Sequence, residues 1–410
     1  MARTDDRRAR VSATYATGET LYDGELKHRT SEAPQLELAR YDAPSSPLQL
    51  VHLRSPDALR QWAPAVGEML VRLGQSEDVT LSPAYYLLTL PPSRGVDVLV
   101  FSNDTTLQAV LYGQRRQVGI WRTGFVTGGD AVGCGCLVGE PAALARVLRL
   151  AAAYYLAAGV HAVRWKLALS AGTVGLPDSV APKGIRQRWL ESAAPGDRLL
   201  LPPSYAAFLY RLSKLTRRNL RYYRRQAEAA GYRFEAGIAF PEYAHCIRQL
   251  RSRLRYPVPE WRLDQQVALL HHFGDGLCAG MRNRQGDLQA LLCGFGADQR
   301  FHLVARATSV NEARSSLGLV LCGYLIEHLI AQGYSELRFL HGALFPLRRQ
   351  CLAQTLLALH LDRPNLLWTP LKWVCGRAVH AAPRICGHWA GDLERIAGSY
   401  SCPPASDAMG

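Results

Sequence analysis

Leu107-Gln-Ala-Val-Leu-Tyr-Gly113 is repeated later in the chain as Leu288-Gln-Ala-Leu-Leu-Cys-Gly294, with five identities over seven residues. Each copy is an apolar β-type run and is the second of three such runs that precede a long helical pattern. The order around both copies is strand, strand, strand, helix, strand. The two matching segments hold the same position in the same series of elements, which indicates an internal repeat. We therefore expect two related α/β units in tandem.

The elements expected in the first unit are strands Val96–Ser102, Leu107–Gly113 and Gln117–Arg122, a helix from Glu140 to Ala158 and a strand at His161–Leu169. A loop, Ser170–Arg198, separates the units. The elements expected in the second unit are helix Tyr205–Ala230, strands Gly276–Arg282, Leu288–Phe295 and Phe301–Ala307, helix Leu317–Gln332 and strand Glu336–Leu340. The fold class is therefore α/β (α+β), with a mixed, mainly antiparallel sheet flanked by helices in each unit.

The domain boundaries follow from length and composition, because 410 residues exceed one ordinary domain. Residues 1–47 are polar and end in Pro44-Ser-Ser-Pro47, which is typical of a flexible extension. The first unit is expected at 48–198 and the second at 199–350. We expect a C-terminal helical extension at 351–410.

The composition favours anionic partners, since 48 Lys and Arg against 34 Asp and Glu give a net charge of +14. The N-terminus has neither a secretory signal nor a membrane anchor, and the most apolar stretches carry charges, so we expect no transmembrane segment. Ten cysteines are scattered singly in apolar runs, which indicates a reducing cytoplasm. The spacing of Cys375, His380, Cys386 and His388 matches no standard zinc motif, and we expect no metal.

A basic segment runs from Leu212 to Ala230. Its six cations fall within an arc of roughly 120° at helical spacing; they are Lys214, Arg217, Arg218, Arg221, Arg224 and Arg225. Two interpretations remain open, a solvated basic face and an anion-binding surface. The second gains support because no acidic residue precedes Glu228, so that like charges repel along the helix.

This segment also carries a family resemblance. Leu201-Pro-Pro-Ser204 followed by Leu212-Ser-Lys-Leu-Thr-Arg-Arg-Asn-Leu220 resembles the signature of the CelD-like acetyltransferases. These belong to the GNAT superfamily, near the FemAB-type aminoacyl transferases. The similarity continues through Ser316-Leu-Gly318 to Leu337-Arg-Phe-Leu-His-Gly342, and it is weaker over 50–200.

The resemblance implies an acyl-CoA donor, such as acetyl-CoA, whose pantetheine chain adds between two splayed strands. Its pyrophosphate is expected at the N-terminus of helix Leu317–Gln332, where backbone N–H groups and the helix dipole favour anions. The residues expected there are Arg314, Ser315, Ser316, Leu317 and Gly318. The first unit has Gly139-Glu-Pro141 at the equivalent place, which suits phosphate poorly, so that unit is expected to be structural or to shape the acceptor cleft.

Acyl transfer needs a base for the nucleophile. The catalytic candidates are His302, His341 and, as an acid, Tyr324; a structural role is the alternative for each. The family often has a Tyr-Lys pair after the last Gly. Here Arg348 and Arg349 lie nearby but out of register and without the phenol, and we expect them to bind an anion together with Lys214, Arg217, Arg218 and Arg221.

Three functional hypotheses follow from these residues. The leading one is an acyl-CoA-dependent N- or O-acyltransferase acting on a sugar or another small polar acceptor. The second is an aminoacyl-tRNA-dependent transferase of the FemAB type, in which the basic helix binds RNA phosphates. The third is a non-catalytic GNAT pair that acts as a binding protein.

Overall fold

A computed structural model describes the chain over residues 48–92, 94–103, 106–118, 121–128, 136–168, 179–250, 260–274, 276–309, 316–340 and 345–363. The extension expected at 1–47 lies outside these ranges, as do residues 364–410. We call residues 48–200 the first half and residues 205–363 the second half.

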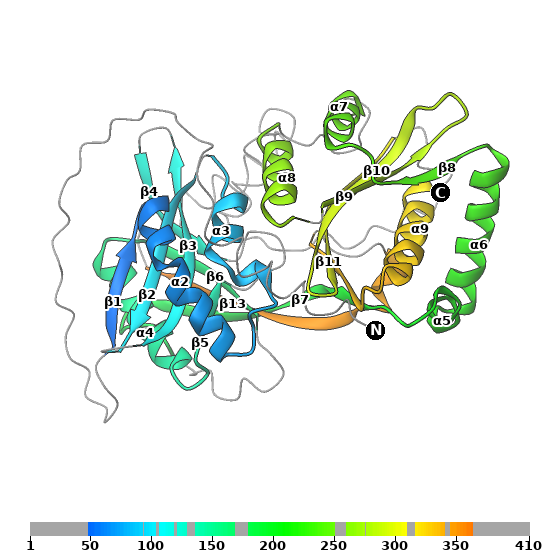
Figure 1. The fold of residues 1–410 in the computed structure, drawn as a ribbon. Coiled ribbons are helices and arrows are strands. Elements are labelled where there is room, and N and C mark those ends of the chain that lie inside the picture. The colour runs from blue at the N-terminus through cyan, green and yellow to red at the C-terminus, as the bar shows by residue number, and fades with distance from the viewer. Residues whose placement is uncertain are drawn as a thin grey trace, which may run out of the picture. The chain divides into compact units, whose positions relative to one another are not determined.

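The first half is a series of strands with helices before and after them (Figure 1). Its elements are β1 (Gln49–Leu53), α2 (Pro56–Arg72), η1 (Val79–Leu81), α3 (Pro83–Thr89), β2 (Arg94–Ser102), β3 (Leu107–Val118), β4 (Trp121–Gly128), β5 (Leu137–Gly139), α4 (Leu144–Ala157), β6 (Ala162–Ala168) and β7 (Arg186–Leu200). Helix α2 starts at Ser55, whose hydroxyl accepts a hydrogen bond from the Ala58 N–H, and it continues through Pro64. The run expected as one strand at Gln117–Arg122 is divided between the end of β3 and the start of β4.

The second half repeats the order of three strands, a helix and a strand. Its elements are α5 (Tyr205–Arg211), α6 (Lys214–Ala229), β8 (Arg233–Ala236), α7 (Phe240–Leu250), α8 (Glu260–His272), β9 (Gly276–Arg282), β10 (Leu288–Ala297), β11 (Arg300–Thr308), α9 (Leu317–Ala331), β12 (Glu336–Phe339), α10 (Phe345–Arg348) and β13 (Leu352–Asp362). The single helix expected at Tyr205–Ala230 is two helices. Leu212 is extended between them, and the Ser213 hydroxyl caps α6 by accepting from the Thr216 N–H.

The described strands form one sheet in the order β1-β2-β3-β4-β6-β13-β7-β12-β11-β10-β9-β8, and β5 pairs with β3. The order is nearly symmetric about its centre: β3 and β10 are each third from an edge, and β4–β6 and β11–β12 are the parallel pairs. The repeated heptapeptides lie in β3 and β10. The two halves are therefore structural equivalents.

The last strand of each half pairs with the other half. Strand β13 lies beside β6, and β7 lies beside β12. Neither β7 nor β13 was predicted, since Ser170–Arg198 was expected to be a loop and the region from 351 was expected to be helical. Their ladder joins residues far apart in the chain, such as Arg186 and Asp362, so that no local signal precedes it. The fold class, a mixed and mainly antiparallel sheet flanked by helices, is confirmed.

Each half of the sheet is covered by helices on both faces. In the first half α4 packs on one face, through residues such as Tyr155, and α2 packs on the other, through Met69. In the second half α9 covers one face, while α7 and α8 cover the other. Tyr85 of α3 joins this last cluster, so that the first half contributes to the core of the second. None of the described helices is long and apolar enough to cross a membrane.

Candidate functional site

Strands β11 and β12 separate in the middle of the second half. They pair in parallel from Arg300 with Glu336 to Leu303 with Phe339, and the Leu340 N–H donates to the Leu303 carbonyl at 3.2 Å. Strand β11 continues to Thr308 along β10. Among the described residues no strand lies on the other side of β11 beyond Leu303. This edge therefore offers backbone hydrogen-bonding groups to an extended ligand.

A β-bulge lies at the point of separation. The pairing of β10 with β11 passes from Cys293 with Ala305 to Gly294 with Leu303, so that Val304 is an extra residue on β11. A bulge turns the local backbone and increases its twist. The bulge requires glycine at position 294, because a Cβ there would clash with the His302 carbonyl oxygen.

Helix α9 begins just after this edge. Ser316 is its N-cap residue and has a left-handed backbone, with φ of 52°. Such a conformation is uncommon outside glycine and is strained. The N–H groups of Leu319 and Val320 both donate to the Ser316 carbonyl, whereas no described group accepts from Leu317 or Gly318. A Cβ on Gly318 would lie 2.9 Å from the Thr308 hydroxyl, so the helix start is packed against the end of β11.

The equivalent place in the first half is filled by the chain itself. Strands β4 and β6 pair in parallel up to Gly128 with Trp165. The next residue of the described chain, Cys136, donates its N–H to the Lys166 carbonyl at 2.8 Å, and its carbonyl accepts from the Tyr112 N–H at 2.7 Å. Cys136 thus bridges β3 and β6 where the second half is open.

The helix that follows also differs. Helix α4 has Ala143 at its N-cap position and no side-chain cap. Glu140 stands just ahead of it and is paired with Arg72 at 2.8 Å. A carboxylate at a helix N-terminus occupies the place that an anionic ligand would take. Only the second half therefore combines an open strand edge with an uncharged helix start among the described residues.

His302 is completely buried on the α7 and α8 side of β11. Its ring stacks on Phe295 with centroids 5.0 Å apart, and neither ring nitrogen has a hydrogen-bond partner among the described residues. Burial, and then the Arg338 guanidinium, lower the pKa of His302 to about 4, although Asp78 opposes this. The imidazole is therefore neutral near pH 7, and the lowered pKa makes it a weaker base than an ordinary histidine. It lies one residue before the separation of β11 from β12.

An ion-pair network surrounds His302 and joins the two halves. Glu336 accepts hydrogen bonds from Arg198 at 2.9 Å and from Arg338 at 2.6 Å. Arg338 also reaches Asp78 of the first half at 2.8 Å. Burial raises the pKa of Glu336, but the bonds from Arg198 and Arg338 outweigh burial and lower it to about 2. Sequence reasoning missed this network because its members come from β7, β12 and the segment before η1.

The first half buries a different carboxylate. Asp97 of β2 accepts from Arg115 at 2.7 Å and from the Tyr155 hydroxyl at 2.6 Å, and it lies 2.9 Å from His52. All these partners belong to the first half. Burial raises the pKa of Asp97, but the hydrogen bond with His52 and the charge of Arg115 leave it below its ordinary value. This network is a local structural core.

Tyr324 lies on the side of α9 that faces α6 and β8. Its hydroxyl donates to Glu228 at 2.6 Å, its ring stacks on Phe234 and the Arg224 guanidinium lies 4.0 Å from the ring centroid. Burial and the bond to Glu228 raise its pKa. The hydroxyl is thus used in holding α9 to α6.

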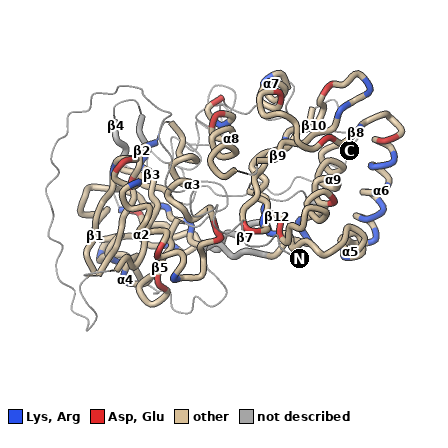
Figure 2. Tube along the Cα trace, in the orientation of Figure 1, with Lys and Arg blue, Asp and Glu red and all other residues tan. Residues whose placement is uncertain are grey.

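The cations of α6 and α10 differ in their exposure and partners. Arg224 is turned inward and pairs with Glu327 at 2.7 Å and with Glu228 at 3.2 Å. Another group is exposed, and Figure 2 shows Lys and Arg positions repeated along α6; its members are Lys214, Arg218, Arg221 and Arg225 on α6, and Arg348 and Arg349 at the end of α10. Arg217 is half-buried, 5.9 Å over the Tyr210 ring.

Three of the predicted site residues lie outside the described ranges, namely Arg314, Ser315 and His341. No group of three potential metal ligands occurs within those ranges. The Cys and His run from 375 to 388 also falls outside them.

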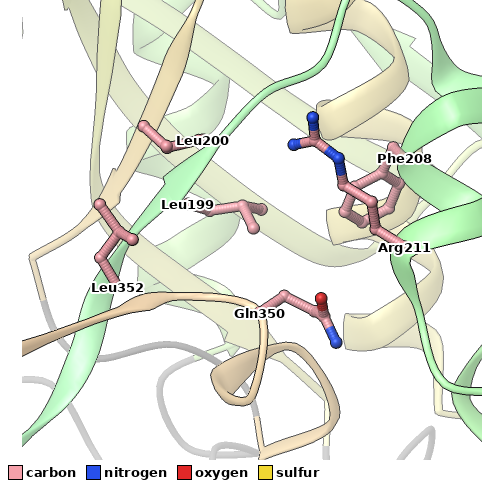
Figure 3. A pocket seen from close by; sticks show the side chains of 6 residues that line it. All are labelled: Leu199, Leu200, Phe208, Arg211, Gln350 and Leu352. Carbon is pink, nitrogen blue, oxygen red and sulfur yellow. The ribbon is translucent and has the colours of Figure 1, made fainter.

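Figure 3 shows a recess lined by residues of β7, α5 and the start of β13. It has an empty volume of about 390 Å³ that includes open solvent, and its lining is apolar except for two polar side chains. Its lining is Leu199, Leu200, Phe208, Arg211, Gln350 and Leu352. It was not predicted, since α5, β7 and the segment before β13 meet there only in the folded chain.

Comparison with known proteins agrees with the geometry of the second half. Residues 214–345 match the family described as "Acetyltransferase (GNAT) domain". The match covers less than half of the chain and includes β8 to β12. No functionally curated protein matches the sequence. The second half is thus similar to a GNAT acetyltransferase domain, and this similarity supports transferase activity.

The solved structures to which the chain is similar include the following three, at low sequence identity and with coverage of most of both chains. The first is L-PGS from Bacillus licheniformis, at 12% identity over 74% of this chain and 91% of that one, with a TM-score of 0.46. A tandem GNAT protein from the clavulanic acid biosynthesis pathway has 12% identity over 78% and 99%, with a TM-score of 0.46. FemX has 10% identity over 80% and 99%, with a TM-score of 0.48.

Proposed function

We propose that this protein transfers an acyl group from acyl-CoA to a small polar acceptor, with the donor bound in the second half. The observation that supports this most is the open edge of β11 beyond Leu303, which bears the Val304 bulge and leads to the start of α9. The pantetheine arm contains two amides, which can pair with a strand edge as a peptide does.

The pyrophosphate would bind at the start of α9. The N–H groups of Leu317 and Gly318 lie at the positive end of the helix dipole, which favours an anion. Ser316 belongs to this proposed site because its left-handed conformation shapes the first turn. We also propose Arg314 and Ser315, which the sequence predicts at this place, as residues that bind the pyrophosphate.

We retain His302 as the proposed base. Its two ring nitrogens have no hydrogen-bond partner among the described residues, and it lies one residue before the point where β11 and β12 separate. In the transfer, the acceptor nitrogen or oxygen attacks the thioester carbonyl, the new C–N or C–O bond forms and the C–S bond breaks. The acceptor proton passes to the base, and the CoA thiolate leaves and takes up a proton from the base or from water, so that CoA is released as the thiol. His341 stays a prediction, whereas the Tyr324 hydroxyl already donates to Glu228.

The acceptor side is proposed to be the face covered by α7, α8 and α3. Gln266 of α8 buries a side-chain oxygen that has no partner among the described residues, and His302 lies on the same face. Unpaired buried polar groups are costly, and a hydroxyl-rich acceptor such as a sugar would satisfy them. The first half, through Tyr85 and Asp78, would shape this side.

The test is protection of the full chain against thermal unfolding by acetyl-CoA, compared with dephospho-CoA and with deacylated tRNA. A ligand at one hundred times its Kd stabilises by about 2.7 kcal/mol. We expect protection by acetyl-CoA and also by dephospho-CoA, which keeps the pantetheine arm and the pyrophosphate. Protection by tRNA alone would favour the aminoacyl-tRNA hypothesis, and protection by none of the ligands would favour a non-catalytic protein.

A further inference from the structure

The outer surface of α6 carries four cations in a line. Lys214, Arg218, Arg221 and Arg225 are all exposed and follow one another at intervals of four, three and four residues. At 100° per residue they span an arc of about 60°, and at 1.5 Å per residue a length of about 16 Å. We call these four residues the α6 stripe.

No described acidic side chain forms an ion pair with the α6 stripe, although the hydrogen bond from Tyr324 and, to a lesser degree, the charge of Arg225 lower the pKa of Glu228. The nearby carboxylates, Glu228 and Glu327, are both bound by Arg224 on the inner side of the helix. Cations spaced at i and i+4 repel one another, so the stripe costs stability as it stands. An anionic surface outside the protein would offset this repulsion.

Exposed apolar side chains border the stripe. Leu215 and Tyr222 are each 59% exposed, and they lie seven residues apart on the same edge of α6. Tyr210, just before the helix, is 81% exposed. The opposite side of α6 is anchored by Leu220 and Ala227, which are buried in the core. A helix fixed in this way presents its cations and its apolar edge to solvent together.

We propose that the α6 stripe docks the protein on an anionic lipid bilayer, independently of the acyl transfer. Interfacial helices combine Lys and Arg with Leu and aromatic side chains at the level of the headgroups. A single-stranded nucleic acid would instead use a groove that follows its backbone and aromatic platforms for its bases. Here the stripe lies on the outer face of a single helix, and Leu215 at its edge is an apolar side chain that a bilayer can bury beside Tyr222.

The experiment compares cosedimentation of the full chain with vesicles of equal parts phosphatidylglycerol and phosphatidylcholine and with phosphatidylcholine alone. We expect binding to the anionic vesicles only. Salt at about 0.5 M, where the Debye length is roughly 4 Å, should release the protein. Failure of the wild-type chain to bind anionic vesicles at low salt would overturn the proposal.

The decisive variant replaces Lys214, Arg218, Arg221 and Arg225 by Gln. Each cation near an anionic surface strengthens binding about fivefold, so we expect at least a hundredfold loss of vesicle affinity. Its thermal stability should equal or exceed that of the wild type because the repulsion is removed. The matched control replaces four exposed cations of the first half by Gln, namely Arg149, Lys183, Arg186 and Arg188. An equal loss in both variants would contradict a specific surface.

A second pair of variants tests the apolar edge. Leu215→Ser with Tyr222→Ser should weaken binding to the anionic vesicles about tenfold, as expected for apolar side chains at the interface. Leu200→Ser, which changes an exposed leucine away from α6, should leave the affinity unchanged. Preferential binding of a mixed-sequence RNA oligonucleotide, with the vesicles unbound, would assign the stripe to nucleic acid and overturn the proposal.

Discussion

The two halves share one order of elements but differ at the place where their central parallel strands end. In the first half the Cys136 backbone joins β3 to β6 and the helix start is preceded by Glu140. In the second half β11 continues beyond Leu303 without a described partner on that side, and α9 starts at Ser316. The same scaffold therefore has one half in which this place is filled by the chain and one half in which the described strand edge has no partner.

The halves also bury their carboxylates differently. Asp97 is held by partners within the first half, whereas Glu336 is held by Arg198 and by Arg338, which itself reaches Asp78. The first network stabilises one half. The second connects β7, β12 and the segment before η1 and surrounds His302. We expect both networks to contribute to stability, and only the second to lie close to the proposed base.

The largest expected effect is on catalysis. His302→Gln removes the proposed base, so kcat should fall about 100- to 10,000-fold while the affinity for acetyl-CoA is kept. The matched control is Thr127→Ala, because Thr127 has the equivalent position in the first half. In the strand register Thr127 is opposite Arg164 of β6, and His302 is opposite Arg338 of β12. Steady-state kinetics and calorimetry measure the two quantities. Full turnover by His302→Gln would exclude this residue as the base.

Asp97→Ala tests the structural half. The substitution leaves Arg115 and Tyr155 without their buried partner, and it should lower the free energy of unfolding by about 3–5 kcal/mol. The affinity of the folded protein for acetyl-CoA should not change. Denaturant titration provides the measurement, and Asp57→Ala is the control because that carboxylate is 81% exposed. A loss of acetyl-CoA affinity with unchanged stability would break the proposed division between the halves.

The pH dependence of stability tests the network between the halves. The pKa of Glu336 is lowered to about 2 from an ordinary value of about 4.5, so its contribution is fully present above pH 4.5 and is lost as the pH falls toward 2. The shift corresponds to about 3 kcal/mol. The wild type should exceed Glu336→Gln by this amount at pH 7 and converge with it near pH 2. A constant difference between the two proteins over this range would contradict the assignment.

Gly318→Glu tests the donor site. A carboxylate in the first turn of α9 would occupy the proposed phosphate position, and it should weaken acetyl-CoA binding about a hundredfold. The matched variant is Ala145→Glu, at the second helical position of α4, and it should have no effect. Isothermal titration calorimetry measures both. If only Ala145→Glu weakened binding, the donor site would belong to the first half.

Much of the fold follows from local pattern. The repeated heptapeptides predicted equivalent strands, and β3 and β10 have equivalent positions in the sheet. Helical spacing predicted α6 and its cations, but it did not predict that Arg224 turns inward, because Glu327 approaches from another helix. The order of elements could be read because hydrophobic periodicity is a property of neighbouring residues.

The sequence by itself determined the tandem repeat, the order of its elements and the basic helix. Only the tertiary structure decided that β7 and β13 are exchanged between the halves and that Glu336 lies between arginines. It also decided that Cys136 joins β3 to β6 in one half, whereas β11 has no described partner beyond Leu303 in the other. These features depend on pairing between residues far apart in the chain. Such pairing leaves no local periodicity, since its energy comes from hydrogen bonds and burial that exist only when distant segments meet.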